Sequence, residues 1–139
     1  MSNHLNDDCI FCKIINGEIP SFKILETELN YVFLDIGPTA EGHTLIIPKY
    51  HSNRMDEVPD KYLAEILPLA KKIAKAIGCV DYNILQNNGK IAFQHVFHVH
   101  FHVIPKRNEE EGLGIGGWPR VERPREDLEK TLQAIVENL

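Results

Sequence analysis

The sequence predicts an α+β fold with a largely antiparallel sheet of five strands, one long helix and one C-terminal helix. Short segments rich in β-branched and aromatic residues outnumber the helical ones, and several are separated by gaps short enough for hairpins. Two longer segments repeat apolar residues at three- and four-residue steps, as amphipathic helices do. The chain has 139 residues, the length of one ordinary domain that can bury its own core.

Each predicted strand is bounded by residues that form turns or break regular structure. The first two strands flank a polar turn at 26–30, the Gly37-Pro38 pair follows the second, and Pro48 ends the third. The five predicted strands are residues 22–25, 31–36, 43–48, 82–86 and 97–104.

Two helices are predicted between and after the strands. The first runs over 59–77, with Pro59 in its first turn and a kink at Pro68, because a proline inside a helix removes one backbone hydrogen bond. The second runs over 125–138, and its apolar residues fall on one face: Leu128, Leu132, Ile135, Val136 and Leu139.

The first eight residues are polar and acidic, and we expect a flexible tail at 1–8 before a single domain at 9–139. They lack the apolar segment of a secretory signal, and the chain has no run of about 18 apolar residues, so we expect no membrane span. Three cysteines, an odd number, then indicate reduced thiols or metal ligands rather than disulfides. We therefore expect the protein in the cytoplasm, with the nucleus as a further location.

The charge balance argues against nucleic acid as the main partner. The formal net charge is -5 at pH 7, and a negative surface repels a phosphate backbone. A single anion-binding cleft remains compatible with this balance, because a local field can differ in sign from the whole surface.

The strongest motif is a row of alternating histidines, His98, His100 and His102. Side chains in a strand alternate between faces, so these three imidazoles are expected to share one face while Val99, Phe101 and Val103 share the other. A single histidine in a strand is usually structural, but three in strict alternation are hard to explain that way. A metal site is the second alternative, because His-x-His is a common ligand pair.

Imidazole suits proton transfer and nucleophilic attack near neutral pH. Its ordinary pKa of about 6.5 leaves most of it neutral at pH 7, with one lone-pair nitrogen that can attack phosphorus. Neighbouring histidines can bind phosphate oxygens or pass a proton to a leaving group. The row alone does not assign these roles to individual rings.

The histidine row, with its apolar spacers, resembles the motif that names the histidine-triad (HIT) superfamily. Other segments are similar to its Hint branch, and together they cover most of the chain: Cys9–Ile15, Gly17–Pro20, Phe33–Ile36 with Pro38, Gly42–Lys49 with His51, Asn87–Gly89 with Gln94, and Trp118-Pro119. The resemblance implies a HIT-like fold whose sheets join across a homodimer. It implies a hydrolase of the adenosine 5′-monophosphoramidase type, which binds a purine nucleoside monophosphate or phosphoramidate and needs no catalytic cofactor.

The same resemblance implies roles for individual residues. His100 would be the nucleophile, His102 would contact the phosphate and the leaving group, His98 would fix the row, and His43 would lie beside it. Polar contacts to ribose and phosphate would come from Asp35, Asn87 and Gln94, and Trp118 would reach the partner subunit's site. The base would lie in an apolar slot made by Ile10, Phe11, Ile14, Phe33, Leu34 and Ile36.

Each of these residues also has a structural explanation. The apolar residues of the slot could belong to the core, and Asp35 could cap the turn at Gly37-Pro38. Asn87-Asn88-Gly89 could be a simple turn, and Trp118 could be ordinary packing.

His95 departs from the family pattern. Hint-type proteins often carry a small hydroxyl residue after the glutamine, where its hydroxyl would donate to the phosphoramidate. An imidazole is bulkier and ionisable, so the preference for the leaving group is expected to differ here.

A structural zinc site is also implied. The Cys9-x-x-Cys12 spacing is typical of zinc ligands, although one such pair is weak by itself. By the resemblance, His51 and His98 would complete the set. Four protein ligands would leave no coordination position for a catalytic water, so the metal would be structural.

Other functions remain open from the sequence. A dinucleoside polyphosphate hydrolase would use the same row, and a nucleotide-binding regulatory module would bind nucleotide without turnover. A nucleotidyl transferase is disfavoured, because the chain is too short for the two-fold repeat of that class.

Overall fold

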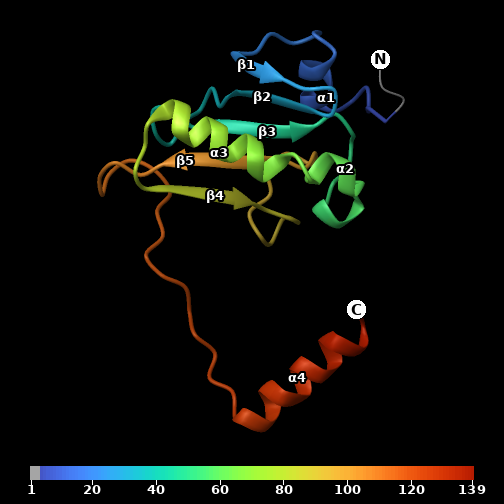
Figure 1. Cartoon of the computed structure of the whole chain (residues 1–139), viewed down its shortest axis with the longest axis vertical. Coiled ribbons are helices and arrows are strands. Elements are labelled where there is room, and N and C mark those ends of the chain that lie inside the picture. The colour runs from blue at the N-terminus through green and yellow to red at the C-terminus, as the bar shows by residue number, and fades with distance from the viewer. Residues whose placement is uncertain (1–3) are drawn as a thin grey trace.

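A five-stranded antiparallel sheet organises the protein, whose computed structural model describes residues 4–139 (Figure 1). The strands lie in the order β1-β2-β3-β5-β4, and each neighbouring pair is antiparallel. The predicted fold class is therefore confirmed. The strand bounds are β1 (Lys23–Glu26), β2 (Asn30–Leu34), β3 (Thr44–Pro48), β4 (Tyr82–Gln86) and β5 (Phe101–Pro105).

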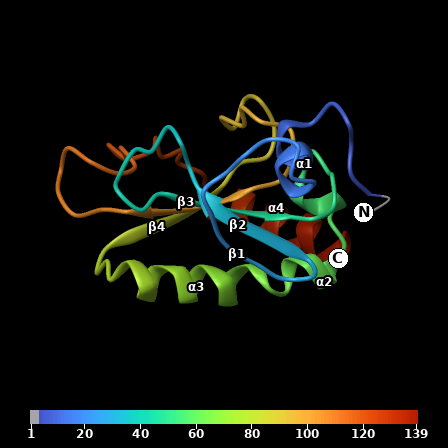
Figure 2. The same ribbon diagram turned by 90° about the horizontal axis from the view of Figure 1, so that it is seen from above.

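The two faces of the sheet bury separate apolar clusters, because strand side chains alternate. Val32, Ile46 and Val103 point to the face covered by α3 (Ile66–Ile77). Phe33 and Leu45 point to the other face, where α1 (Ile10–Ile15) packs. Figure 2 shows α3 on one side of the sheet, and α1 with the loop between β4 and β5 on the other.

The prediction of one continuous helix over 59–77 is wrong, because the segment forms two helices. A short 3-10 helix, η1 (Met55–Glu57), comes first, then α2 (Asp60–Leu63), and α3 begins at Ile66. Pro68 is therefore the third residue of α3 and not an interior kink. A proline costs no helical hydrogen bond there, because the first four N–H groups have no partner within the helix.

The last strand begins later than predicted, at Phe101 instead of residue 97. The two partner strands determine this start. Phe101 pairs with Gln86, the last residue of β4, and with Ile46 of β3. Residues 97–100 therefore have no ladder partner. Val99 is nevertheless fully buried under α3 with Phe101, so the alternation that separates the histidines from the core continues through this segment.

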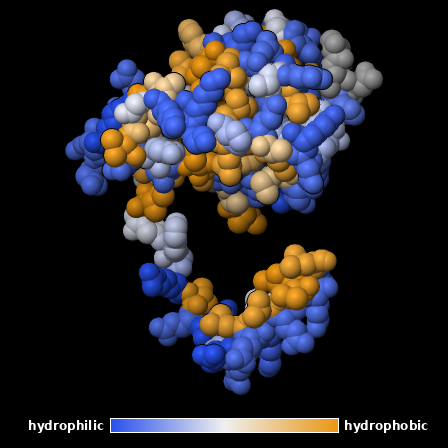
Figure 3. Space-filling model, viewed as in Figure 1, coloured by the Kyte–Doolittle hydropathy of each residue, from blue (hydrophilic) through white to orange (hydrophobic). Residues whose placement is uncertain are grey.

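Helix α4 (Arg125–Glu137) lies apart from the sheet, at the end of the segment 106–124 (Figure 1). Its predicted apolar residues are all more than half exposed. Figure 3 shows these residues gathered on the side of α4 that is turned toward the body of the protein. Among the described residues, no helix combines the length and apolarity needed to span a bilayer.

Residues 4–8 contact the body of the protein. The His51 N–H donates to the His4 carbonyl at 2.7 Å, and the rings of His4 and Tyr50 stack with centroids 4.7 Å apart. These contacts were not predicted for the flexible tail at 1–8. Residues 1–3 of that tail lie outside the described part of the chain.

Candidate active site

A cleft of about 490 Å³ opens on the face of the sheet that carries α1. Its volume is within the range of small-molecule sites. The structure brings most of the predicted site residues to its wall: Ile10, Phe11, Ile14, Phe33, Leu34, Asp35, Ile36, His43, Asn87, His95, His100 and His102. Ile19, Leu45, Phe93 and Leu113 also line it and were not predicted, because nothing in their local pattern separates them from core or loop residues.

His100 is held in one tautomer by the chain itself. Its Nδ1 lies 2.7 Å from the His98 carbonyl oxygen, so Nδ1 carries the hydrogen and donates it. The lone pair is then on Nε2. Burial lowers the pKa of His100, with Asp35 acting in the opposite direction, and the ring is neutral at pH 7. A neutral imidazole with a free Nε2 in a cleft is a competent nucleophile.

A hydrogen-bonded chain fixes the tautomers of His43 and His102 as well. The Thr39 N–H donates to His43 Nδ1 at 3.2 Å, so the hydrogen of the neutral His43 ring is on Nε2. His43 Nε2 lies 2.9 Å from His102 Nδ1 and donates to it. The hydrogen of His102 is therefore on Nε2. Burial lowers the pKa of His43, and burial together with His100 lowers the pKa of His102 to about 4.

Asp35 caps the turn at Gly37-Pro38, one of the two roles that the sequence left open, and its contact to a ribose stays a prediction. Its Oδ1 accepts the Gly37 N–H at 2.8 Å, which caps the turn, and its Oδ2 lies 3.6 Å from His43 Nε2. It also lines the cleft, where it is the one carboxylate among the described lining residues. A carboxylate can accept several hydrogen bonds at once, so the turn leaves it capacity for a ligand.

Gln94 and Trp118 are not in the cleft. Gln94 is 2% exposed, and its polar atoms bond to backbone: Oε1 accepts the Gly89 N–H at 2.7 Å, and Nε2 donates to Asn53 O at 2.8 Å and Val96 O at 3.1 Å. Gln94 thus holds the loop between β4 and β5 rather than presenting an amide to a ligand. Trp118 is 76% exposed and lies on the segment before α4.

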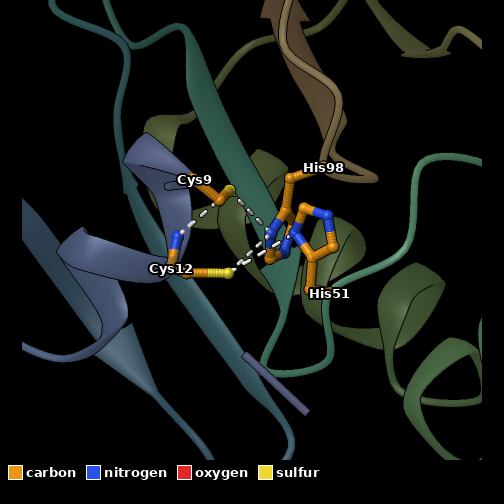
Figure 4. Close-up of side chains that lie close together, drawn as sticks. All are labelled: Cys9, Cys12, His51 and His98. Atoms are coloured by element: carbon orange, nitrogen blue, oxygen red, sulfur yellow. Dashed lines mark hydrogen bonds between the residues drawn. The ribbon is translucent and has the colours of Figure 1, made fainter. Parts of the chain in front are cut away.

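A second cluster lies behind the cleft, where the structure brings Cys9, Cys12, His51 and His98 together (Figure 4). His98 Nδ1 is 3.4 Å from both sulfurs, and His51 Nδ1 is 3.5 Å from Cys12 Sγ. Zn–S bonds of about 2.3 Å and Zn–N bonds of about 2.0 Å at tetrahedral angles place sulfur and nitrogen roughly 3.5 Å apart. The four residues therefore fit a zinc ion.

The protonation of this cluster also suits a cation. His98 Nε2 donates to Pro48 O at 2.9 Å, which leaves the lone pair on Nδ1, and burial lowers the pKa of His98 to about 4. Burial raises the pKa of the Cys12 thiol to about 12, against the hydrogen bond from the Asn6 N–H. Two buried sulfurs that face the lone-pair nitrogen of His98 need a nearby positive charge to become thiolates.

The group Asp35, His43 and His102 is a poorer metal site, although its ligand atoms also lie close together. His43 and His102 are joined by a direct hydrogen bond of 2.9 Å. Two nitrogens on one tetrahedral zinc would stand about 3.3 Å apart with no hydrogen between them. Among the described residues, His100 belongs to neither group of candidate ligands, so a metal held by His100 and His102 is disfavoured. Of the histidine row, only His98 lies with the cysteines.

His98 connects the two clusters. Its side chain faces the cysteines, while its carbonyl oxygen accepts the hydrogen that fixes the tautomer of His100. Phe11 packs edge-on against both rings, with centroids 5.9 Å from His98 and 5.2 Å from His100. A displacement of the cluster of Cys9, Cys12, His51 and His98 would therefore reach His100 through one carbonyl and one aromatic ring.

The fold and the cleft define a class of small α+β proteins with a histidine-lined site on an antiparallel sheet. Residues 16–109 match the HIT domain family, and the chain belongs to this family. The inclusion of α4 in one domain with these residues stays a prediction.

A curated relative and two solved structures agree with this assignment. The chain is 56% identical over 135 residues to adenosine 5′-monophosphoramidase HNT1 of Saccharomyces cerevisiae, covering 97% of this chain and 85% of that protein. A crystal structure of a histidine triad nucleotide-binding protein from Candida albicans is similar with a TM-score of 0.89 and 50% identity, covering 94% of this chain and 96% of that one. A Zn-bound histidine triad family protein from Mycobacterium smegmatis has a TM-score of 0.68 and 36% identity, covering 94% of each chain.

Proposed function

We propose that this chain is a hydrolase of the adenosine 5′-monophosphoramidase type. It cleaves the P–N bond of purine nucleoside 5′-phosphoramidates, such as AMP linked to a simple amine or to lysine, and releases AMP and the amine. The observation that carries the proposal is His100, whose Nδ1 hydrogen is committed to the His98 carbonyl so that Nε2 is free in the cleft. The name of the Saccharomyces cerevisiae relative supports the same activity.

The reaction has two displacements. His100 Nε2 attacks the α-phosphorus, the P–N(amine) bond breaks, and a nucleotidyl-histidine forms. As the negative phosphate binds, it raises the pKa of His102, and the ring takes up one proton from solvent to become cationic. The cationic ring then gives its Nε2 proton to the departing nitrogen and returns to the neutral form. Water then attacks the phosphorus and gives a proton back to His102, while the P–N(His100) bond breaks and AMP leaves. His102 returns this proton to solvent, and each nitrogen ends in its starting protonation state.

The nucleotide occupies the rest of the cleft in this proposal. The apolar residues from α1 and β2 contact the base, and Asp35 accepts hydrogen bonds from the ribose hydroxyls. Asn87 is the remaining amide that faces the cleft among the predicted ligands, since Gln94 is committed to the loop backbone. Gln94 therefore acts on the nucleotide indirectly, through the position of residues 87–96.

A structural zinc at Cys9, Cys12, His51 and His98 is part of the proposal. The distances among the four ligand atoms support it, as does the Zn-bound relative. With all four positions taken by protein, the metal supplies rigidity and no step of the reaction. It holds α1 against the histidine row, and no other cofactor is proposed.

We also propose a homodimer located in the cytoplasm, and in the nucleus as well. β4 is an edge strand, and its Tyr82 and Ile84 are 42% and 38% exposed, which suits the joining of two sheets. The apolar side of α4 would be buried against a second copy. Analytical ultracentrifugation tests this, and a monomer at micromolar concentration would contradict it.

The free cysteines are consistent with a reducing compartment.

The deciding experiment measures AMP and amine release from adenosine 5′-phosphoramidate by the wild type and by His100→Ala. Turnover by the wild type with a loss of at least a thousandfold in the variant supports the proposal. Binding of AMP without turnover would instead identify a nucleotide-binding module. Faster cleavage of diadenosine triphosphate than of the amidate would identify a dinucleoside polyphosphate hydrolase.

A further inference from the structure

The charged loop 106–112, which follows β5, is hydrogen-bonded to the loop that leads into β3. The Gly112 N–H donates to the Thr39 carbonyl at 2.8 Å, and Thr39 Oγ1 donates to the Gly112 carbonyl at 3.1 Å. Arg107 Nη1 donates to the Glu41 carbonyl at 2.7 Å, which adds a third contact between the two loops. The loops lie side by side at one end of the sheet (Figure 2). The charged loop therefore supports the segment before β3.

Only a glycine fits at position 112 in this arrangement. Gly112 is buried and has a φ of 87°, in the left-handed region that side chains disfavour. A Cβ there would lie 2.7 Å from the Pro105 carbonyl oxygen, which belongs to β5, and 2.8 Å from Lys106 Cδ. Lys106 Nζ also donates to the Glu111 carbonyl at 2.8 Å, which closes the turn before Gly112. An added side chain would therefore move the peptide that bonds to Thr39.

Thr39 connects this contact to the catalytic histidines. Its carbonyl and hydroxyl are bonded to Gly112, and its N–H donates to His43 Nδ1 at 3.2 Å. Thr39 is exposed, so burial does not hold it in place. The His43 N–H donates to the Ala40 carbonyl at 3.1 Å, which closes the turn but leaves both ring nitrogens of His43 without a partner in it. The Thr39 N–H therefore decides which ring nitrogen of His43 carries the hydrogen.

The tautomer of His43 decides what His102 presents to the leaving group. With its hydrogen on Nε2, His43 donates to His102 Nδ1 at 2.9 Å, and His102 Nε2 carries a hydrogen in the neutral ring as in the cationic one. With its hydrogen on Nδ1, His43 would accept from His102 Nδ1, and the neutral ring would turn a lone pair toward the leaving nitrogen. Asp35 Oδ2 lies 3.6 Å from His43 Nε2, beyond hydrogen-bonding distance, and does not fix this choice.

We propose that Gly112 and Thr39 are positioning residues for proton delivery to the leaving nitrogen. Gly112 holds Thr39, and the Thr39 N–H keeps the hydrogen of His43 on Nε2. His43 in turn keeps a hydrogen on His102 Nε2. Gly112 and Thr39 act through His43 and not on the substrate. This inference rests on the proposed function and gives the charged loop a role in it.

The first measurement compares Gly112→Ala with Gly116→Ala, the same change at a second glycine of the segment before α4. Gly116 is not among the described residues that line the cleft, and a Cβ there would meet open space. Nitrogen-15 NMR of the imidazole rings distinguishes the two tautomers without substrate. We expect the hydrogen of His43 on Nε2 in the wild type and in Gly116→Ala, and a mixture of tautomers in Gly112→Ala.

The second measurement uses two AMP derivatives, an alkylamine phosphoramidate whose nitrogen needs a proton and a fluorophenyl ester whose oxygen leaves without one. In Gly112→Ala, kcat should fall about tenfold more for the amidate than for the ester. Thr39→Val removes one of the two bonds to Gly112 and should show the same pattern at about threefold. Thr39→Ser keeps the hydroxyl and should lie closer to the wild type than Thr39→Val does.

Each outcome decides the inference. A mixture of His43 tautomers together with a larger loss for the amidate supports it, and Thr39→Val provides the result if Gly112→Ala does not fold. Wild-type tautomers in both variants, or equal losses for the amidate and the ester, overturn it and leave the proposed function intact. No turnover of the amidate by the wild type overturns both.

Discussion

Two clusters of histidine lie on the same side of the sheet and are built on different principles. In the cluster of Cys9, Cys12, His51 and His98, sulfur and nitrogen atoms face one another at 3.4–3.5 Å, and the lone pair of His98 Nδ1 is turned inward. In the cleft, His43 and His102 are 2.9 Å apart with a hydrogen between them. The first arrangement fits a cation, and the second fits a substrate that exchanges protons, as proposed above. The same side chain thus serves two chemistries according to which ring nitrogen the backbone occupies.

The largest expected difference between the clusters comes from His100→Ala. The change removes the nucleophile and leaves the four ligands of the metal cluster intact. We expect hydrolysis of adenosine 5′-phosphoramidate to fall by at least a thousandfold, while zinc content and melting temperature change little. Mass spectrometry of acid-quenched wild type should also detect a nucleotidyl adduct that the variant lacks. Loss of zinc in His100→Ala would contradict the separation of the two clusters.

Cys12→Ser tests the metal cluster from the other side. A serine hydroxyl is a poor zinc ligand, so we expect zinc to be lost and the free energy of unfolding to fall by about 2–5 kcal/mol. Activity should fall as a consequence, because the His98 carbonyl that fixes His100 moves with the cluster. Metal analysis and thermal denaturation provide the measurements. Cys79→Ser is the matched control, since Cys79 is a free cysteine outside the cluster, and equal effects of the two variants would refute the metal assignment.

His43→Ala sharpens the description of the cleft. Without the hydrogen from His43 Nε2, His102 Nδ1 is no longer fixed as an acceptor, and its Nε2 hydrogen is no longer directed to the cleft. We expect kcat to fall about 10- to 100-fold for a substrate with a poor amine leaving group. A leaving group that departs without a proton, such as a fluorinated phenol in an AMP ester, should lose much less. An equal loss for both substrates would argue against a role in proton delivery.

The smallest expected effect is the pH response of His102 in the free protein. Burial and His100 lower its pKa to about 4, so the ring stays neutral in the folded state while the unfolded chain takes up a proton near pH 6.5. Its contribution to the free energy of unfolding is therefore full above pH 6.5 and declines as the pH falls toward 4. NMR titration of the assigned ring measures the midpoint. AMP should raise this midpoint, and a midpoint near 6.5 without ligand would contradict the buried, neutral state.

Much of this arrangement could be predicted from local sequence pattern. The alternation at residues 98–103 separates the histidines from the core, and this separation holds even where the strand ladder is absent. The short strand segments with hairpin-like gaps and the small number of helices indicated the antiparallel sheet. The errors lie where the local signal was ambiguous. Pro68 fits a kink as well as a first turn, and the start of β5 depends on where its partner strands end.

The sequence by itself determined the fold class, the face that the histidine row occupies and the chemical types of the ligands, because these follow from short-range alternation and from side-chain chemistry. The tertiary structure decided which residues meet. His43 reaches His102 across 59 positions, and Cys9 reaches His98 across 89. The tertiary structure also directs the Gln94 side chain to the loop backbone and places His95 at the cleft. Such pairings depend on strand order and loop closure, which carry no periodic signal along the chain, and the proton positions follow from those pairings.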